Sequence, residues 1–298
     1  MSTPTLRTVL GNYPHTQPLK QGSLPHAGVS LDFVDVSPVH KAFAPMVRDA
    51  AYDVCELAIV TALQAIAYGA PVILLPAVVA SRFQRGCIVG WEANGIPDPT
   101  ALAGKRIAVR AYTQTTGMWV RHHLYEDFGL DVKAVEWITQ DPAHVAEYQD
   151  PPFVSHIPKD KALTDLLRAG EADAAIFGND LPKEPGFTPL IADAEARDAA
   201  WWNTHGFMPI NHMVAASQAA CKATPDAVRA AYRLLKESAS HAATATGKPV
   251  PYRFGFTALR DPVAYTIEAC RRQDLLPRTL SVDEVFAPAM ELLGHDGD

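Results

Sequence analysis

The stretch RAYTQTTGMWVR, residues 110–121, places many hydrogen-bond donors around the start of one expected helix. The donors are Arg110, Tyr112, Thr115, Thr116 and Arg121. Backbone N–H groups in the first turn of a helix have no partner within it, and the helix dipole favours negative charge there. Because a surface helix needs only one cap, this pattern predicts a site that holds a small molecule with a carboxylate.

Arg121 falls on the same helical face as the apolar residues that are expected to pack inward. An inward guanidinium needs an anionic partner, which is either a protein carboxylate or a ligand. The position also suits an arginine at the edge of the apolar face with its stem extended to solvent, so both interpretations stay open. Arg110 directly follows an expected strand, at the usual cleft side of an α/β sheet, and is a second candidate for the carboxylate.

Three further positions carry groups suited to acid–base or anion chemistry. Glu56 ends an apolar run, where it could bond a ligand hydroxyl, transfer a proton or cap the following helix. His212 lies in a strand-like run near an expected hinge, as a proton donor or as a structural histidine. Arg82 follows a buried strand and faces either a cleft or solvent. His122 and His123 are adjacent on a helix and cannot easily chelate one metal.

Composition and missing motifs exclude several classes of function. The chain contains no HExxH, GxSxG, P-loop or GxGxxG motif, which removes sequence support for zinc proteases, α/β-hydrolases, NTPases and dinucleotide enzymes. Its net charge of −7 offers nothing to neutralise a run of phosphates, so we expect no nucleic-acid partner. The most apolar segment, residues 71–80, is too short to cross a bilayer and contains two prolines, so we expect no membrane partner.

The four cysteines are far apart and form no CxxC pair, which predicts small buried thiols in a reducing compartment. The first residues lack the charged region and long apolar run of a secretory signal. We therefore expect a cytoplasmic protein. The sequence leaves the oligomeric state open, a homo-oligomer included.

Strand-like and helix-like segments alternate along the chain, which favours an α/β fold with largely parallel sheets. The region 115–128 predicts a helix that ends at Gly129, and Thr224–Pro225 predicts another helix start. The polar, proline-rich segment 139–160 predicts a long loop over one lobe. Strands are expected at 6–13, 29–37, 53–56, 71–80, 132–138 and 207–217.

The order of these segments predicts two lobes with a ligand cleft between them. Lobe 1 would comprise residues 1–108 and 214–298, and lobe 2 would comprise residues 109–213. The two connections between the lobes would form a hinge.

Several sequence blocks together resemble the 4,5-dihydroxyphthalate decarboxylase family, whose members have the type 2 periplasmic-binding-protein fold. The blocks are GNY near the start, YDVCEL at 52–57, LP…SRF at 75–83, LAGKRIAVRAYTQTTGMWVRHHL at 102–124, LRAGEADAAI at 167–176 and GFMPINHMV at 206–214. The chain departs from the family pattern at three positions. His122 stands where a small residue is expected, Asn211 stands where an apolar residue is expected, and His15 stands where an arginine would fit.

The resemblance implies non-oxidative removal of CO₂ from a hydroxylated aromatic acid, of the type that converts 4,5-dihydroxyphthalate to protocatechuate, without an organic cofactor. In this interpretation Glu56 would bond or deprotonate a ring hydroxyl and His212 would donate a proton, two roles that could be exchanged. The implied substrate-binding residues are Arg110, Arg121, Thr115 and Thr116 for the carboxylates, and Tyr112, Trp119, Trp137, Arg82 and His15 for the rest of the pocket.

The partner implied by this resemblance is a small aromatic carboxylate. A divalent metal held by His15, Glu56 and His212 is conceivable, but no spacing pattern supports it, and we expect no metal. Two other classes stay open. One is an exported solute-binding protein for a small organic acid, and the other is a different lyase on the same fold.

Overall fold

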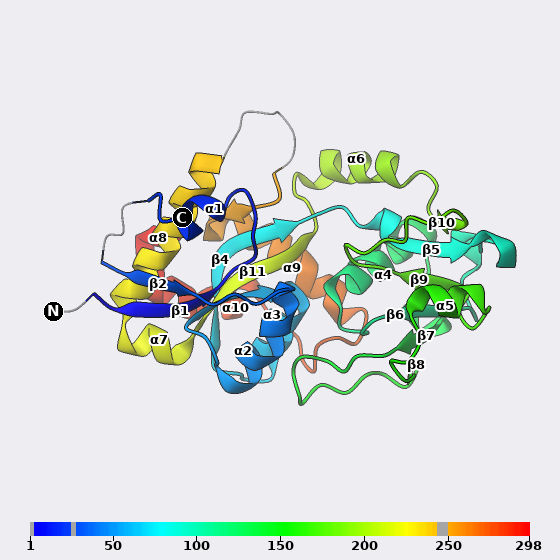
Figure 1. The fold of residues 1–298 in the computed structure, drawn as a ribbon, viewed down its shortest axis with the longest axis horizontal. Helices are drawn as coiled ribbons and strands as arrows, with labels where there is room; N and C mark the ends of the chain where they lie inside the picture. Colours follow the sequence, from blue (N-terminus) through cyan, green and yellow to red (C-terminus); the bar gives the residue numbers. More distant parts are fainter. Residues whose placement is uncertain (1–2, 25–27, 243–249) are drawn as a thin grey trace.

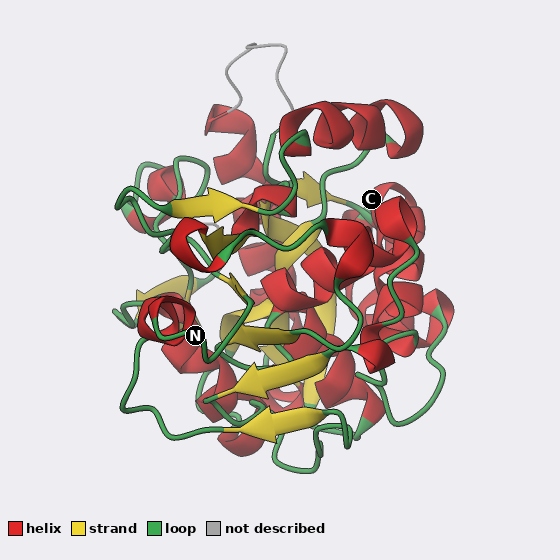
Figure 2. Cartoon of the chain, turned by 90° about the vertical axis from the view of Figure 1, so that its right-hand side faces the viewer, coloured by secondary structure: helices red, strands yellow, loops and turns green. Residues whose placement is uncertain are grey.

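The strands form two separate sheets, one in each of two lobes that lie side by side (Figure 1). This computed structural model describes residues 3–24, 28–242 and 250–298, and within them each sheet has six strands. The first strand and the last helix belong to the same lobe, because the chain crosses to the second lobe and returns. Helices cover the sheets (Figure 2), which gives the α/β architecture expected from the alternating segments.

The strands of lobe 1 are β1 (Thr5–Val9), β2 (Ser30–Phe33), β3 (Val54–Ala58), β4 (Val72–Ser81), β11 (Ile210–Ser217) and β12 (Arg253–Phe254). They lie in the order β12-β4-β11-β3-β1-β2. The side chains of β3 are all buried, and most of those of β4 are, which explains their continuous apolar sequences. The expected strands at 53–56 and 71–80 are therefore confirmed.

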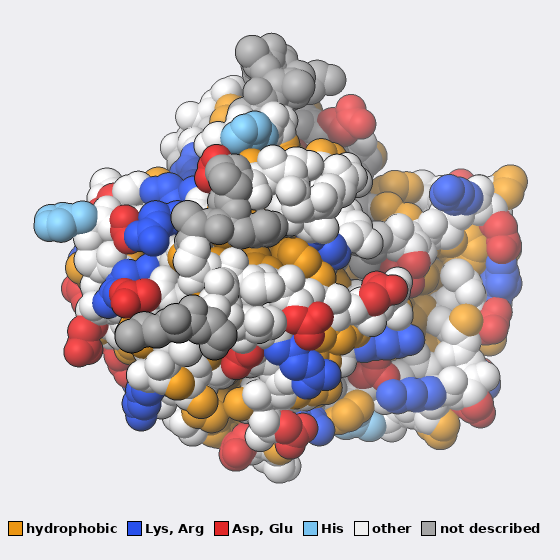
Figure 3. Space-filling model, turned by 60° about the vertical axis from the view of Figure 1, so that its left-hand side comes forward, with side chains coloured by type: hydrophobic (Ala, Val, Ile, Leu, Met, Phe, Trp, Pro, Cys, Tyr) orange, Lys and Arg blue, Asp and Glu red, His pale blue; other side chains and the backbone are white. Residues whose placement is uncertain are grey.

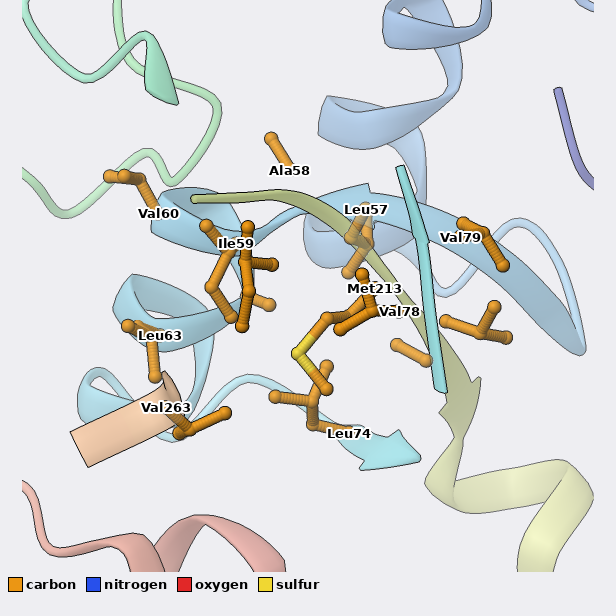
Figure 4. Close-up of a cluster of buried hydrophobic side chains, with 14 of the residues drawn as sticks. Leu57, Ala58, Ile59, Val60, Leu63, Leu74, Val78, Val79, Met213 and Val263 are labelled. Carbon is orange, nitrogen blue, oxygen red and sulfur yellow. The ribbon is translucent and has the colours of Figure 1, made fainter. Parts of the chain in front are cut away.

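The helices of lobe 1 are α1 (Gln17–Lys20), α2 (Phe43–Asp49), α3 (Ile59–Ala67), α7 (Gln218–Ala223), α8 (Pro225–Ala242), α9 (Phe256–Arg271) and α10 (Val282–Leu293). The helix start predicted at Thr224–Pro225 is confirmed by α8. Apolar side chains from β3, α3, β4, β11 and α9 form a buried core (Figure 4). Its members include Leu57, Leu63, Leu74, Val78, Met213 and Val263.

The strands of lobe 2 are β5 (Ile88–Trp91), β6 (Arg106–Val109), β7 (Glu136–Thr139), β8 (Val154–His156), β9 (Ala174–Ile176) and β10 (Phe187–Pro189). They lie in the order β10-β5-β9-β6-β7-β8. The accompanying helices are α4 (Thr115–Phe128), α5 (Leu163–Arg168) and α6 (Ala194–His205). Gly129 follows α4 with φ 71°, a left-handed conformation that suits glycine, so the predicted helix and its end are confirmed.

The division of the chain between the lobes differs from the expected one. β5 and β6, which were expected in lobe 1, belong to the second sheet, and all of β11 belongs to the first. The chain therefore crosses between Ser81 and Ile88 and returns between His205 and Ile210. The two crossings lie together, since the Arg82 N–H donates to the Pro209 carbonyl at 3.2 Å. The first crossing is packed against its surroundings and carries no cluster of Gly, Pro or Ser that would mark a linker, which is why the boundary was misplaced.

Both sheets are mixed rather than largely parallel. β11 runs antiparallel to β3 and β4, and β5 runs antiparallel to β9 and β10. These are the strands that the chain forms on entering each sheet from the other lobe. The remaining central pairs, such as β6 with β7 and β9, are parallel, so their carboxyl ends meet at one edge.

The four cysteines are buried free thiols, as the sequence predicts. Among the described residues, no helix is both long enough and apolar enough to span a bilayer. Basic and acidic side chains alternate across the face drawn in Figure 3, without a large area of one sign.

Candidate active site

A cavity of about 650 Å³ lies between the two lobes. Residues at the carboxyl ends of strands line it from both sides, which is where α/β sheets usually place their ligands. Lobe 1 contributes Tyr13, His40, Phe43, Thr61, Arg82, Asn211 and His212, and lobe 2 contributes Arg110, Thr113, Gln114, Thr115, Thr116, His144, Asn179 and Asp180, among others. The structure thus brings together five of the predicted site residues: His212, Arg82, Arg110, Thr115 and Thr116.

His212 and Glu56 form a hydrogen-bonded pair at the wall of this cavity. On the antiparallel strands β11 and β3, His212 is opposite Ala58 and Glu56 is opposite Val214, so the two side chains are diagonal neighbours. The His212 Nδ1 donates to Glu56 Oε1 at 2.6 Å. His212 is 21% exposed and Glu56 is fully buried. The second ring nitrogen of His212, Nε2, is therefore available to a ligand.

Glu56 accepts two further hydrogen bonds, from the Tyr13 hydroxyl and from the Gly11 N–H, each at 2.6 Å. Burial opposes ionisation of this carboxyl group, but the bonds from His212, Tyr13 and Gly11 outweigh it and hold the pKa of Glu56 below its ordinary value. Burial and the Glu56 carboxylate raise the pKa of Tyr13, so its hydroxyl stays protonated and donates. Glu56 is thus a buried anion that orients His212 from behind.

Gly11 has a steric role in this arrangement. A Cβ atom at this position would lie 2.6–2.8 Å from ring and hydroxyl atoms of Tyr13, closer than the ring allows. Glycine therefore lets the chain after β1 turn tightly enough to bring both its N–H and the Tyr13 hydroxyl onto Glu56. This explains the GNY block in structural terms.

Two arginines supply positive charge to the cavity. Arg82 donates from one nitrogen to the Gly178 carbonyl at 3.1 Å and from another to Thr116 Oγ1 at 2.8 Å, so it joins the two lobes. Arg110 donates to His40 Nε2 at 2.9 Å and lies 3.6 Å from the Asp141 carboxylate. The Arg110 atom nearest Asp141 is its buried Nε, which has no hydrogen-bond partner among the described residues.

Two helices begin at the cavity, one from each lobe. α3 begins after Ala58 and α4 begins after Gln114, and neither has a side-chain cap. Ala58, Gln114, Thr115 and Thr116 all line the cavity. The first-turn N–H groups, of which that of Val60 donates to Thr115 Oγ1 at 3.5 Å, and the dipoles of both helices favour an anion there. Together with the arginines, they make the cavity suitable for a carboxylate-bearing ligand.

The sequence did not single out His40 and His144, which also line the cavity. His40 lies in a 3₁₀ turn (Val39–Ala42), and His144 lies in the long loop between β7 and β8. The His144 Nδ1 is 2.8 Å from Thr61 Oγ1. Neither segment has the periodic pattern of a helix or strand. The only sequence signal was for His144, a titratable residue in a long polar loop.

Arg121 does not reach the cavity, contrary to the sequence prediction. It is fully buried, donates from Nε to Gln273 Oε1 at 2.6 Å and from a terminal nitrogen to the Tyr112 carbonyl at 2.7 Å. Its guanidinium also packs on the rings of Tyr112 and Trp137, 4.0 Å and 5.1 Å from their centroids. The inward orientation was right, but an amide, a carbonyl and two rings take the place of the expected anion.

Four other predicted pocket residues also lie outside the lining of the cavity. Tyr112 donates to the Gln273 carbonyl, Trp119 to the Ile210 carbonyl and Trp137 to the Val132 carbonyl. His15 is buried behind the cavity wall, with Nε2 2.9 Å from the Val79 carbonyl and its ring stacked on Tyr13. The side-chain polar atoms of Tyr112, Trp119 and Trp137 and the Nε2 of His15 are therefore bonded inside the protein, as expected of buried structural residues.

Gln273, which follows α9, also links the lobes. It is 1% exposed, and its side-chain nitrogen donates to the Met118 carbonyl at 2.9 Å while its oxygen accepts from Arg121. Two residues further on, the Leu275 carbonyl accepts from Gln64 of α3. The turn after α9 is therefore bonded both to α4 of lobe 2 and to α3 of lobe 1.

The residues considered for a metal do not form a metal site. Glu56 and His212 are bonded to each other, whereas His15 is bonded to Val79. Within the described ranges, no group of three or more His, Cys, Asp or Glu side chains is arranged to hold a metal ion.

The sequence is similar to two characterised proteins, although it matches no established family profile. It is 30% identical to the 4,5-dihydroxyphthalate decarboxylase of Pseudomonas putida over 215 aligned residues. The alignment covers 68% of this chain and 83% of that protein. It is 29% identical to the 4,5-dihydroxyphthalate decarboxylase of Comamonas testosteroni over 225 aligned residues, and this alignment covers 71% of this chain and 68% of that protein.

Solved structures with a similar fold include periplasmic binding proteins. The alkanesulfonate-binding protein SsuA of Xanthomonas axonopodis pv. citri, bound to MOPS, superposes with a TM-score of 0.61 at 15% identity, over 94% of this chain and 97% of that one. The desulfurization enzyme DSZB superposes with a TM-score of 0.57 at 16% identity, over 98% of both chains. These likenesses confirm the two-lobed, periplasmic-binding-protein-like fold.

Proposed function

Because the chain belongs to the 4,5-dihydroxyphthalate decarboxylase family, we propose that it is a carboxy-lyase that removes CO₂ from 4,5-dihydroxyphthalate or a closely related hydroxylated aromatic acid. The observation that carries this proposal is the His212–Glu56 pair, whose free ring nitrogen faces a cavity with two arginines and two helix starts. A proton donor beside a carboxylate-binding cavity is what the reaction requires.

The first task of the site is to hold the substrate carboxylates. Arg110 and Arg82 are the cationic side chains of the cavity, and the first turns of α3 and α4 add backbone donors. The hydrogen-bond partners of Arg82, Gly178 and Thr116, are neutral. Because no protein carboxylate neutralises its positive charge, Arg82 can pair with a carboxylate of the ligand. In this proposal Arg110 and Arg82 bind the carboxylates, in place of the expected Arg110 and Arg121.

The second task is to deliver a proton to the ring carbon that loses CO₂. His212, protonated on both nitrogens, would donate from Nε2 while Nδ1 stays bonded to Glu56. The bond between that carbon and its carboxylate breaks, its electron pair returns to the ring, and CO₂ leaves. The net reaction consumes one proton, which His212 regains from water. The buried Glu56 carboxylate stabilises the protonated imidazole and fixes its orientation.

The proposal includes neither an organic cofactor nor a metal, since a phenol-activated ring can accept the electron pair itself. It also places the protein in the cytoplasm, a location that four free buried cysteines suit. The ring is enclosed by both lobes, with Phe43 on the wall beside His212.

The test is incubation of the protein with 4,5-dihydroxyphthalate, with and without a chelator, and measurement of CO₂ and protocatechuate. A panel of phthalates that lack one or both hydroxyl groups defines the substrate. We expect turnover of the dihydroxy acid that a chelator does not abolish, and loss of most turnover in the His212→Gln variant. Tight binding of the acid without CO₂ release would instead identify a solute-binding protein.

A further inference from the structure

The decarboxylation also requires a group that interacts with the ring hydroxyl, and Glu56 is not available for it. Both oxygens of Glu56 already accept hydrogen bonds from Gly11, Tyr13 and His212, and its side chain is fully buried. A base has to reach the proton it abstracts directly or through one water. Another side chain of the cavity must therefore take this role.

We propose that His144 accepts the proton of the ring hydroxyl through Nε2, an assignment that rests on the proposed function. His144 lines the cavity, and its Nδ1 is held 2.8 Å from Thr61 Oγ1. With the hydrogen on Nδ1 and donated to Thr61, Nε2 presents a lone pair. No described residue forms a hydrogen bond with that nitrogen.

The separation of His144 and His212 does not exceed what one substrate ring can span. Both imidazoles meet the same Phe43 ring edge-on, with centroid distances of 5.6 Å for His144 and 5.2 Å for His212. The two imidazoles are therefore at most about 11 Å apart. An acid and a base that act across a benzene ring, each at hydrogen-bond distance, are separated by a length on the order of 10 Å.

Contacts with lobe 1 hold His144 in place. It belongs to the loop between β7 and β8 of lobe 2, whereas Thr61 and Phe43 belong to lobe 1. Arg48 of α2 donates to the His144 carbonyl at 2.6 Å and to the Ala143 carbonyl at 2.8 Å. The long loop predicted from the sequence thus carries a functional group across the cleft, to the opposite lobe.

The charged surroundings of His144 favour its neutral form before substrate binds. Burial, followed by the nearby Arg110, His40 and Arg48, lowers the pKa of His144 to about 4, and Asp141 opposes this only weakly. A bound dicarboxylate places negative charge beside Arg110, which offsets the effect of the arginine and raises the basicity of the imidazole. The substrate itself therefore prepares His144 to take a proton.

Other groups of the cavity are less suited to this step. The His40 Nε2 lone pair already accepts from Arg110, at 2.9 Å. The Tyr13 hydroxyl donates to Glu56 and stays protonated. Asp180 is exposed to solvent, and one of its oxygens accepts from the Gly178 N–H at 2.9 Å. His144 combines a free lone pair, partial burial and a fixed orientation.

The full step balances as follows. The hydroxyl O–H bond breaks as His144 Nε2 gains the proton, and the oxygen electron pair shifts into the ring toward the carbon that carries the leaving carboxylate. That carbon takes a proton from His212, the bond to the carboxylate breaks, and CO₂ departs. His144 then returns its proton to the product oxygen, and no oxidant or reductant is needed.

The experiment compares kcat, KM and the pH profile of the wild type with those of His144→Gln. We expect kcat to fall by about 10²–10⁴-fold, with a small change in KM, because glutamine can bond a hydroxyl but cannot take its proton. The acidic limb that wild-type kcat shows as the base is protonated should disappear. In His144→Ala, added imidazole should restore part of kcat in a concentration-dependent way. His241→Gln, an exposed substitution on α8, is the matched control and should behave like the wild type.

The outcomes separate this assignment from the proposed function. Wild-type kcat retained by His144→Gln, or an acidic limb that persists in it, overturns the assignment alone. A loss of kcat in His144→Ala that imidazole does not restore in any part would show a structural role and likewise overturns it. Absence of CO₂ release from the wild type removes both the proposed function and this assignment. Circular dichroism of each variant verifies that it is folded.

Discussion

Replacing Gln273 with alanine should loosen the joint between the two lobes. The substitution takes the Gln273 oxygen from the buried Arg121 Nε, a contact of 2.6 Å, and removes an additional donor from the Met118 carbonyl, which keeps its backbone bond within α4. Arg121 already has one terminal nitrogen without a partner among the described residues, so two of its three nitrogens would then be unsatisfied. A lost hydrogen bond to a buried charged group costs about 1.5–3 kcal/mol. For a chain of this size, that lowers the melting temperature by roughly 5 °C.

Thermal unfolding followed by circular dichroism measures this effect, with Gln149→Ala, an exposed position, as the matched control. A Gln273→Ala protein that melts within about 2 °C of the control would refute the reasoning. A double variant, Arg121→Met with Gln273→Leu, tests the cause of the cost. Because it removes the charge together with its partner, it should recover part of the lost stability. A double variant less stable than Gln273→Ala would show that packing, and not the unpaired charge, sets the cost.

Three further predictions concern the cleft and the joint. Glu56→Gln should lower kcat by about 10²–10⁴-fold, because it disturbs the orientation and charge of His212. Calorimetry should show little change in the affinity for protocatechuate. Equal losses in kcat and in affinity would contradict this prediction. The folded pKa of Glu56 lies below its ordinary value of 4.5, so its contribution to the free energy of unfolding is complete above about pH 4.5 and is lost as the pH falls through the folded pKa. Urea unfolding at pH 6 and pH 3 should therefore show a larger loss for the wild type than for Glu56→Gln, and parallel losses would disprove it. Gly117→Ala should lower the melting temperature, since the new Cβ would lie 3.1 Å from Arg121 Nη1 and 3.2 Å from Val109 Cγ2; an unchanged value would show that the joint can yield.

Much of the fold could be predicted because its elements have strong local patterns. The helix from Thr115 to Phe128 ends at a glycine with positive φ, and β3 and β4 are unbroken apolar runs. The crossing at residues 82–87 was missed for the opposite reason. It is packed and carries no cluster of Gly, Pro or Ser, and β5 is only four residues long, so nothing local marks the change of lobe.

The site was predicted only in part, because spacing shows which way a side chain points but not what it meets. Glu56 and His212 were each predicted as catalytic residues, but their hydrogen bond comes from the register of β3 and β11, which the sequence does not show. The inward direction of Arg121 was also correct, but its partner Gln273 is 152 positions away in the sequence. An amide so distant gives no signal in the helix itself, so an anionic ligand was inferred in its place.

The bonding of Arg121 to Gln273 has a consequence for reading other members of the family. The block RAYTQTTGMWVR mixes two kinds of positions: Arg110, Thr115 and Thr116 face the cavity, and Tyr112, Trp119 and Arg121 hold the lobes together. A relative that keeps the second set with a glutamine after α9 has inherited the same scaffold, whatever acid it accepts. Differences in substrate should be sought at the positions of His40, Arg82, Arg110 and His144.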